Sequence, residues 1–458
     1  MIKGLIKILL TVVLILITAI IYLSTVGIKT DKFNDQIKKG ILEINNKINI
    51  KLSKVTYLLN PYNFSINVKT KNSQILIENS EIDINSIKTN ISLKSLINDQ
   101  LFIDDLQIST AEIKLNDLIL LARIVHNTPQ LFILNSIIKD GSIAADININ
   151  FDNDGKIKNN YEIKGFVQNT RLDLLNKSSI KDLNFSFDIT RNKYSLSKIN
   201  AAFDEIKFNS PFIQIEGKKD LYLIDGTLLN KDQKLEGKDL KLIFGNLPNN
   251  FDIREIEFSS KNNFSFTINK KLKFNDLKVK TTIDLDQLIF IEKSLNLKPF
   301  LPNTKEEIKF ENHKIKIDYS KDQLTIDGNW DVFLTNNIEK ISYAIIRNNN
   351  QFIFNTKLNI ENNPLIIEFL DYEKKEGVNS IISIKGDLKK NGSIKFESIS
   401  LEENKNKILI NNLELSPTFK INNIGSFNAD YKNNKNIVNK LSLKKDNSNF
   451  ILDGDSFD

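Results

Sequence analysis

Few side chains in this sequence could perform chemistry. The chain has no cysteine, two histidines, one methionine and one tryptophan, which excludes disulfide scaffolds, zinc fingers, cysteine nucleophiles and most histidine-based metal sites. His126 follows a short helical pattern and His313 opens an expected strand, and neither has a serine or carboxylate at a spacing typical of a catalytic base. We therefore expect both histidines to be ordinary surface or helix-end residues.

The carboxylates also lack a catalytic arrangement. Asp104 and Asp105 are adjacent in the sequence, as are Glu306 and Glu307. On a strand, adjacent side chains point to opposite faces, so neither pair can act together on one substrate. We expect these carboxylates to be solvated charges.

One segment approaches a calcium-binding loop. It begins at Asn150 and includes Asp152 and Asp154, but its first position is an amide and its twelfth, Tyr161, carries no carboxylate. The run Asn153-Asp154-Gly155 is instead typical of a hairpin turn. The sequence therefore predicts no catalytic residue, no metal site and no cofactor.

The charges are numerous but mixed along the chain. The sequence has 63 lysines and arginines and 57 aspartates and glutamates, a formal net charge of +6. Lysines alternate with acidic residues, and no basic stretch carries the aromatic residues on which bases stack. We expect no nucleic-acid partner.

The N-terminus carries a membrane segment. Ile8 to Ile28 are 21 consecutive residues without charge, and at about 1.5 Å per residue they span about 31 Å, the thickness of the hydrocarbon core of a bilayer. A cleaved signal peptide is the alternative, but its apolar region is shorter and ends in a small-x-small site, which Tyr22 to Gly27 do not offer. Lys3 and Lys7 precede the segment, so the positive-inside rule predicts a cytoplasmic N-terminus and an exported remainder.

The exported part reads mainly as β-strands. After Phe33, Ile37, Ile41 and Ile44, which recur at helical spacing, apolar residues alternate with polar ones almost to the end of the chain. Each such strand has one apolar and one polar face. The pattern predicts a mainly β protein in which a transmembrane helix is followed by one long, curled antiparallel sheet.

Helices and turns are the minor features of the pattern. Leu118 to Val125 fit one short helix, and Asp286 to Leu295 fit another. Besides Asn153 to Gly155, the turn candidates are Asp140-Gly141, Asp225-Gly226, Asp327-Gly328 and Asn391-Gly392. The prolines are candidates for loop or edge positions: Pro61, Pro129, Pro211, Pro248, Pro299, Pro302, Pro364 and Pro417.

The apolar faces of so many strands must be shielded from water. With few helices, the sheet must fold onto itself or form a trough whose lining stays open for an apolar occupant. We expect residues 1–28 to be the cytoplasmic end and anchor, 29–60 a juxtamembrane helix and linker, and 61–458 an extended β-groove. The candidates for its lining are Phe64, Ile66, Val68, Ile147, Ile149, Phe151, Phe185, Phe187, Phe264, Phe266, Ile283, Leu285, Ile315, Ile317 and Ile326.

Three segments resemble a known family. Ile91 to Ile108 is similar to the opening of AsmA-like proteins. Gly141 to Phe151, with the turn and the strand that follow it through Val167, is also similar to this family. Phe450 to Asp458 resembles the YhdP branch, which belongs to the YhdP/TamB group of bridge-like lipid transport proteins. The resemblance covers most of the chain as a pattern. It implies a protein anchored in the inner membrane of a Gram-negative bacterium, with its bulk in the periplasm.

The resemblance also implies a function. Such a protein conducts phospholipids along a β-groove toward the outer membrane, with a partner protein of the outer membrane or periplasm and no catalytic residue. Phe450 to Asp453 read as a further strand, so we expect the groove to continue past Asp458 or to meet a partner there.

Three classes of function remain open from the residues. A lipid conduit predicts an apolar groove open along its length. A structural or adhesive β-protein predicts a closed, dry core, and an enzyme predicts a polar pocket with convergent ionisable groups. Trp330 and many of the 29 phenylalanines occupy apolar positions of the alternation, where core packing and lipid lining require the same residues.

Overall fold

The protein is mainly β, as the alternation predicts. The computed structural model describes residues 2–44, 46–77, 80–93, 103–125, 128–152, 157–174, 178–204, 206–244, 252–271, 273–291, 297–348, 351–389, 392–418, 420–446 and 449–456. Within these residues 26 strands belong to one antiparallel sheet, and two more form a separate hairpin. The chain divides into two compact units, Met1–Ile224 and Asp225–Asp458. The sheet is not strongly curled, so the curled groove is not confirmed.

The first unit contains four described helices and twelve complete strands. The helices are α1 (Ile2–Thr25), α2 (Asn34–Ile44), α4 (Leu115–Val125) and α5 (Pro129–Ile137). The strands are β1 (Ile28–Thr30), β2 (Ile48–Lys51), β3 (Val55–Asn60), β4 (Ser65–Ile77), β5 (Ser80–Ser92), β6 (Ile103–Thr110), β7 (Ile113–Lys114), β8 (Ile138–Asn150), β9 (Glu162–Asp173), β10 (Ser179–Thr190), β11 (Lys193–Phe203) and β12 (Ile206–Lys218).

The second unit consists almost entirely of strands. The unit boundary falls within β13 (Leu221–Glu236), which is followed by the short helix α6 (Gly237–Phe244). The remaining elements are β14 (Asp252–Asn269), β15 (Phe274–Ile291), β16 (Glu307–Tyr319), β17 (Gln323–Phe333), β18 (Ile338–Asn348), β19 (Gln351–Ile360), β20 (Leu365–Ile367), the 3₁₀ helix η1 (Glu368–Leu370), β21 (Tyr372–Lys374), β22 (Ser380–Lys389), β23 (Ile394–Glu403), β24 (Asn406–Leu415), β25 (Ile421–Asn423), β26 (Ser426–Lys432), β27 (Val438–Asp446) and β28 (Asn449–Ser456).

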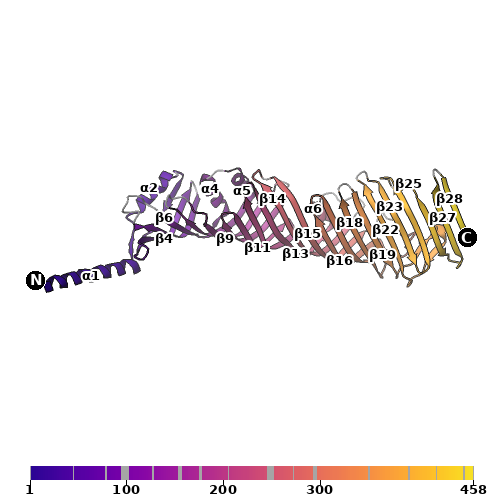
Figure 1. Cartoon of the computed structure of the whole chain (residues 1–458), viewed down its shortest axis with the longest axis horizontal. Helices are drawn as coiled ribbons and strands as arrows, with labels where there is room; N and C mark the ends of the chain where they lie inside the picture. Colours follow the sequence, from indigo (N-terminus) through magenta and orange to yellow (C-terminus); the bar gives the residue numbers. More distant parts are fainter. Residues whose placement is uncertain are drawn as a thin grey trace. The chain divides into compact units, whose positions relative to one another are not determined.

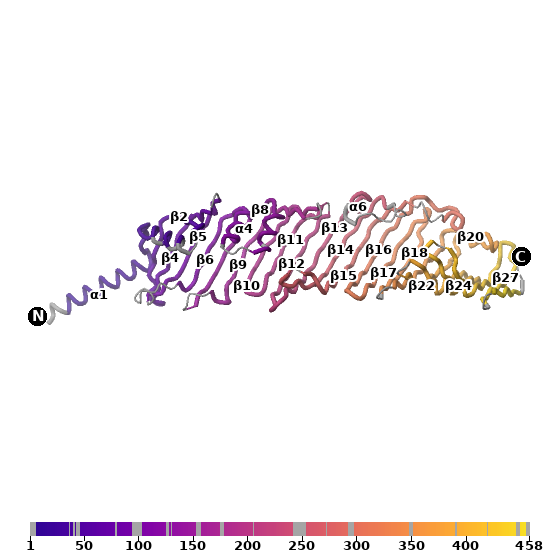
Figure 2. The backbone as a smooth tube through the Cα atoms, turned by 90° about the horizontal axis from the view of Figure 1, so that it is seen from above, coloured from indigo at the N-terminus to yellow at the C-terminus, as the bar shows by residue number. Residues whose placement is uncertain are grey.

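The strands pair in the order of the chain. In the first unit β8 to β12 pair successively, and in the second β14 to β19 do the same. Figure 2 shows the chain running to and fro, so that strands adjacent in the sequence lie side by side. This meander needs only short connections.

The N-terminal helix α1 is the apolar segment of the sequence (Figure 1). Residues Ile6–Thr25 are long and apolar enough to cross a membrane, and none of the apolar window is buried within the protein. A membrane anchor and a signal sequence share these properties. The spacing of Phe33 to Ile44 correctly predicts α2, and that of Leu118 to Val125 correctly predicts α4.

The helix expected at Asp286 to Leu295 is wrong. Asp286 to Ile291 are the end of β15, where Leu288 pairs with Phe310 and Phe290 with Ile308. Pairing on both sides outweighs the local pattern, because each apolar side chain packs on its cross-strand neighbour. Residues 292–296 lie outside the described part.

Three turn candidates lie inside strands. Asp140-Gly141, Asp225-Gly226 and Asp327-Gly328 belong to β8, β13 and β17. Gly328 serves a close approach, because a Cβ there would lie 2.5 Å from the Tyr343 ring. Asn153 to Gly155 and Asn391 lie outside the described residues.

The prolines follow the expected pattern in part. Pro129 is the first residue of α5, whose cap is Thr128, and Pro211 lies within β12. Pro248 lies outside the described residues. The final strand β28 forms where Phe450 to Asp453 predict it, with Phe450 51% and Leu452 65% exposed.

Candidate functional site

The candidate site of the second unit is one apolar face of its strands. Cross-strand pairs join Ile283 to Ile315, Ile317 to Ile326, and Ile345 to both Ile326 and Phe354. Paired residues point to the same side of a sheet. The intervening Lys316, Asp318 and Asp327 are exposed, so the charged residues occupy the opposite face.

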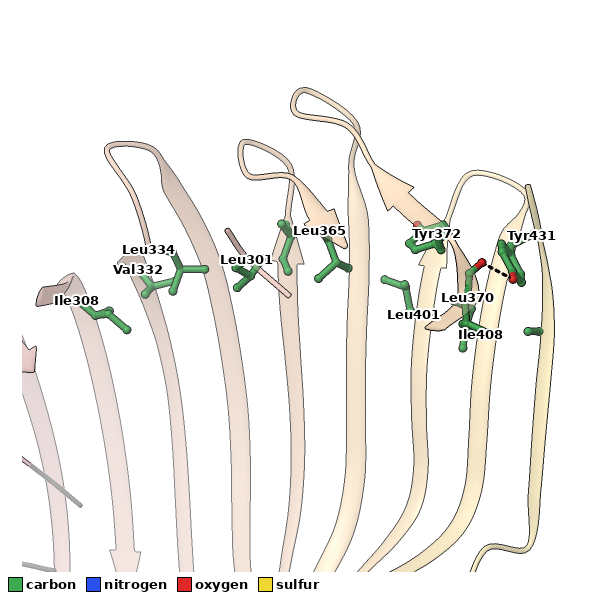
Figure 3. Packing of buried hydrophobic residues seen from close by; sticks show 12 residues of the cluster. Leu301, Ile308, Val332, Leu334, Leu365, Leu370, Tyr372, Leu401, Ile408 and Tyr431 are labelled. Carbon is green, nitrogen blue, oxygen red and sulfur yellow. Dashed lines mark hydrogen bonds between the residues drawn. The ribbon is translucent and has the colours of Figure 1, made fainter. Parts of the chain in front are cut away.

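One end of this face is buried beneath a cover. We use this name for residues 365–374, which form β20, η1 and β21, and Figure 3 shows their side chains against the strand ends. Leu365, Leu370 and Tyr372 of the cover pack into one cluster with strand residues such as Ile360 and Leu401. The cover also rests on a neighbouring loop, since the Ile366 amide donates to the Phe300 carbonyl at 2.9 Å.

Buried polar groups anchor the cover to the strands. Glu339 of β18 accepts hydrogen bonds from the amides of Glu361 and Asn362, both at 2.8 Å, and from Asn363 Nδ2 at 2.7 Å. The Lys374 ammonium donates to the carbonyls of Ile360 and Glu361 at 3.1 and 2.9 Å, and burial lowers its pKa. These ionisable groups therefore hold backbone in place.

Two tyrosines complete the attachment of the cover. Tyr372 Oη donates to Glu403 at 2.6 Å, and burial followed by this hydrogen bond raises the pKa of Tyr372. Tyr431 Oη donates to the Leu370 carbonyl at 2.6 Å, the dashed line of Figure 3. Both hydroxyls tie the cover to strands well away from it in the sequence.

Beyond the cover, the same face remains partly open. Ile317, Ile326, Ile345, Phe354 and Ile384 lie further along the covered strands and belong to neither buried cluster. Each is half-buried. The described chain therefore has an apolar face that is closed at one end and accessible along the rest.

The first unit has a similar face. Ile147 pairs with Ile108 and Ile163, and Ile163 pairs with Ile189. Helix α4 covers part of it, because Leu118, Leu121 and Ile124 pack against the buried cluster of this unit. Figure 1 shows α4 and α5 on one side of these strands.

The register places most predicted lining residues on these faces. In the first unit Ile66, Val68, Ile147, Ile149, Phe185 and Phe187 share one side of the sheet. In the second, Phe264, Ile283, Leu285, Ile315, Ile317 and Ile326 do so, and the Phe266 ring stacks on that of Phe264. Two candidates lie apart: Phe64 precedes β4 with a φ of 48°, and Phe151 forms an isolated bridge with Ile157.

Left-handed residues keep the apolar side chains on one face where the alternation slips. Asn412 has a φ of 51°, and it lies between Ile410 and Leu413, which pair with Ile399 and Phe396. A three-residue step would otherwise turn Leu413 to the polar side. Asn312 has a φ of 50° and plays the same part between Phe310 and His313, both of whose rings contact Trp330.

His313 is not the surface residue that the sequence predicts. It lies inside β16 and is 1% exposed, its ring stacks on Trp330 at 3.9 Å, and its Nε2 lies 3.1 Å from Tyr343 Oη. Burial lowers the pKa of His313 to about 4 and raises that of Tyr343 to about 12. The imidazole is therefore neutral at pH 7. His126 lies outside the described residues.

The other candidate chemical groups are dispersed. Asp105 accepts from Asn90 Nδ2 at 2.6 Å, and Glu307 forms an exposed ion pair with Arg254 at 2.9 Å. Within the described ranges, no three histidine or acidic side chains gather as metal ligands would.

Comparison with protein families and with curated proteins identifies no relative. The chain matches no protein-family model and no curated protein. The geometry of the apolar faces therefore carries the functional argument.

Proposed function

We propose that this protein is anchored in the inner membrane by α1 and carries phospholipid, or another acyl-chain lipid, along its apolar face toward the outer membrane. Its N-terminus is cytoplasmic and its strands are periplasmic. The resemblance to AsmA-like proteins supports this proposal, as does the placement of charge. The function is envelope lipid homeostasis, with a partner protein at the receiving side.

The observation that carries the proposal is the half-open face beyond the cover. Apolar surface left in water is unfavourable by about 25 cal/mol per Å², and soluble proteins seldom keep large continuous patches of it. An acyl chain lying on Ile317, Ile326, Ile345 and Phe354 would remove that surface from water. Curling of the sheet around the lipid, which forms a groove, is part of the proposal.

The proposal assigns no catalytic step. Buried Glu339, buried Lys374 and half-buried Glu403 are engaged in holding the cover and the segment that leads into it. Buried His313 packs against Trp330 and Tyr343. A lipid carrier needs only a continuous apolar path and an exit.

A structural or adhesive role is the second candidate. The two buried clusters, beneath the cover and beneath α4, are packed like an ordinary protein core. If a partner closes the remaining face in the same way, the protein holds no lipid.

A charge on the open face distinguishes the two functions. We expect Ile317→Lys to fold and yet to lose acyl-chain binding about tenfold or more, because an ammonium on this face is desolvated by the lipid. The measurement is capture of lipid by a photo-crosslinking residue at position 345, in cells and after purification.

The matched control lies on the polar face. Thr325 is adjacent to Ile326 and pairs with Asp318, so Thr325→Lys adds the same charge beside a carboxylate and should leave crosslinking unchanged. If position 345 of the wild-type protein captures no lipid, and Ile317→Lys unfolds, the face is a closed core and the structural role is correct.

A further inference from the structure

One cation lies on the apolar face of the second unit. Arg347 of β18 pairs with Leu324 and Phe352, and it follows Ile345 by two residues. Its side chain therefore lies on the same side as Ile345. Across the described residues of β16–β19 and β22–β24, the only other charged positions on this face are Glu339 and Glu403. Glu339 binds the segment that leads into the cover, and Glu403 binds Tyr372 of the cover.

The guanidinium of Arg347 has no acidic partner. It lies over the Tyr319 ring, 5.5 Å from its centroid, and Nη2 approaches the Lys321 carbonyl only at 3.5 Å. Among the residues that the structure describes, no carboxylate oxygen lies within 4.0 Å of it. Stacking on an aromatic face leaves the edge of the guanidinium, with its N–H donors, available to an anion.

The position of Arg347 fits one end of a lipid molecule. From Arg347 to Ile341, the uncovered length of β18 is about 20 Å at about 3.4 Å per residue. One leaflet of a bilayer core is about 15 Å thick. An acyl chain can therefore lie along this stretch, with its polar end at Arg347 and its methyl end toward the cover.

We propose that Arg347 binds the phosphodiester of a phospholipid whose acyl chain lies on Ile345 and its cross-strand neighbours. The proposal rests on the proposed function and adds the residue that favours a lipid with an anionic phosphate over a lipid without a phosphate. Guanidinium and phosphate match in geometry and form paired, charge-assisted hydrogen bonds. Tyr319 fixes the plane in which these donors point.

The test compares two lipids with the same acyl chains. Full-length protein in detergent is offered phosphatidylglycerol or diacylglycerol, and bound lipid is counted by native mass spectrometry. We expect Arg347→Met to lower retention of phosphatidylglycerol about tenfold while diacylglycerol is retained as before, since a charge-assisted hydrogen bond is lost. Arg347→Lys should retain an intermediate amount.

The controls separate charge from folding. Arg254→Met removes an exposed arginine from β14 and should leave the retention of both lipids unchanged. Tyr319→Leu keeps the guanidinium but removes the ring beneath it, so it should lower the retention of phosphatidylglycerol and leave that of diacylglycerol unchanged. This variant tests the proposal even if Arg347→Met does not fold.

Each outcome has a distinct meaning. If wild-type protein and Arg347→Met retain both lipids equally, or if Arg347→Met and Tyr319→Leu lose both alike, Arg347 does not recognise phosphate, and the lipid-carrying function stands. If the wild-type protein retains neither lipid, the function itself is wrong and the inference falls with it.

Discussion

His313 shows how a single buried side chain couples this fold to pH. The unfolded imidazole has a pKa of about 6.5, whereas burial against Trp330 lowers the folded value to about 4. Between these values the unfolded chain binds the additional proton, so this contribution to stability is complete above about pH 6.5 and is lost as the pH falls toward 4.

We expect this loss to disappear in His313→Phe. The wild-type free energy of unfolding should fall more between pH 7.5 and 4.5 than that of the variant, by about 2 kcal/mol. Urea unfolding at the two pH values measures the difference. Because the two proteins differ only at position 313, the carboxylates contribute equally to both losses. Equal losses would show that the folded imidazole accepts a proton freely.

The burial of His313 was partly visible in the sequence. His313, Ile315 and Ile317 are spaced by two residues, and this alternation places the histidine on the same face as the two isoleucines. Its polarity led to the wrong prediction, because the partners that accommodate it, Trp330 and Tyr343, come from two other strands. Only the register brings the three rings together.

At the scale of elements, the cover depends on one carboxylate. Glu339 accepts three hydrogen bonds at the entry to the cover and is almost fully buried. Glu339→Ala leaves those donors without an acceptor, which destabilises by about 2–4 kcal/mol.

The effect should be local as well as global. We expect hydrogen exchange of residues 365–374 to accelerate in Glu339→Ala, while Glu368→Ala, an exposed change within the cover, should match the wild-type protein. Unchanged exchange in both variants would mean that apolar packing alone holds the cover.

The strands were predictable and their interruptions were not. Period-two alternation identifies β8, β10 and β16 directly, but Ile410 and Leu413 stand three residues apart, and only the left-handed Asn412 explains why both stay on one face. Helix α5 was missed because Leu131 to Leu134 are four consecutive apolar residues that mark no single face, although Pro129 after Thr128 is a helix-start signal. The cover could not be predicted from the sequence either, because Lys374 is buried by residues distant in the sequence.

At the scale of the whole molecule, the orientation of α1 decides where the strands reside. Lys3 and Lys7 lie in the first turns of α1, before its apolar stretch, so we expect alkaline phosphatase fused after Asn60, at the end of β3, to be active because it is exported. A fusion at the same position with α1 deleted should be inactive. Inactivity of the full fusion would place the strands in the cytoplasm.

The neighbour-to-neighbour pairing also sets the order in which the protein can fold. Each of β15 to β19 pairs with the strand made just before it, so a chain that emerges N-terminus first can add strands one at a time, with short loops to close. The cover departs from this order, because the Leu370 carbonyl accepts its hydrogen bond from Tyr431, which lies 61 residues later in the chain. During synthesis, the last attachment of the cover therefore forms only after β26 has been made.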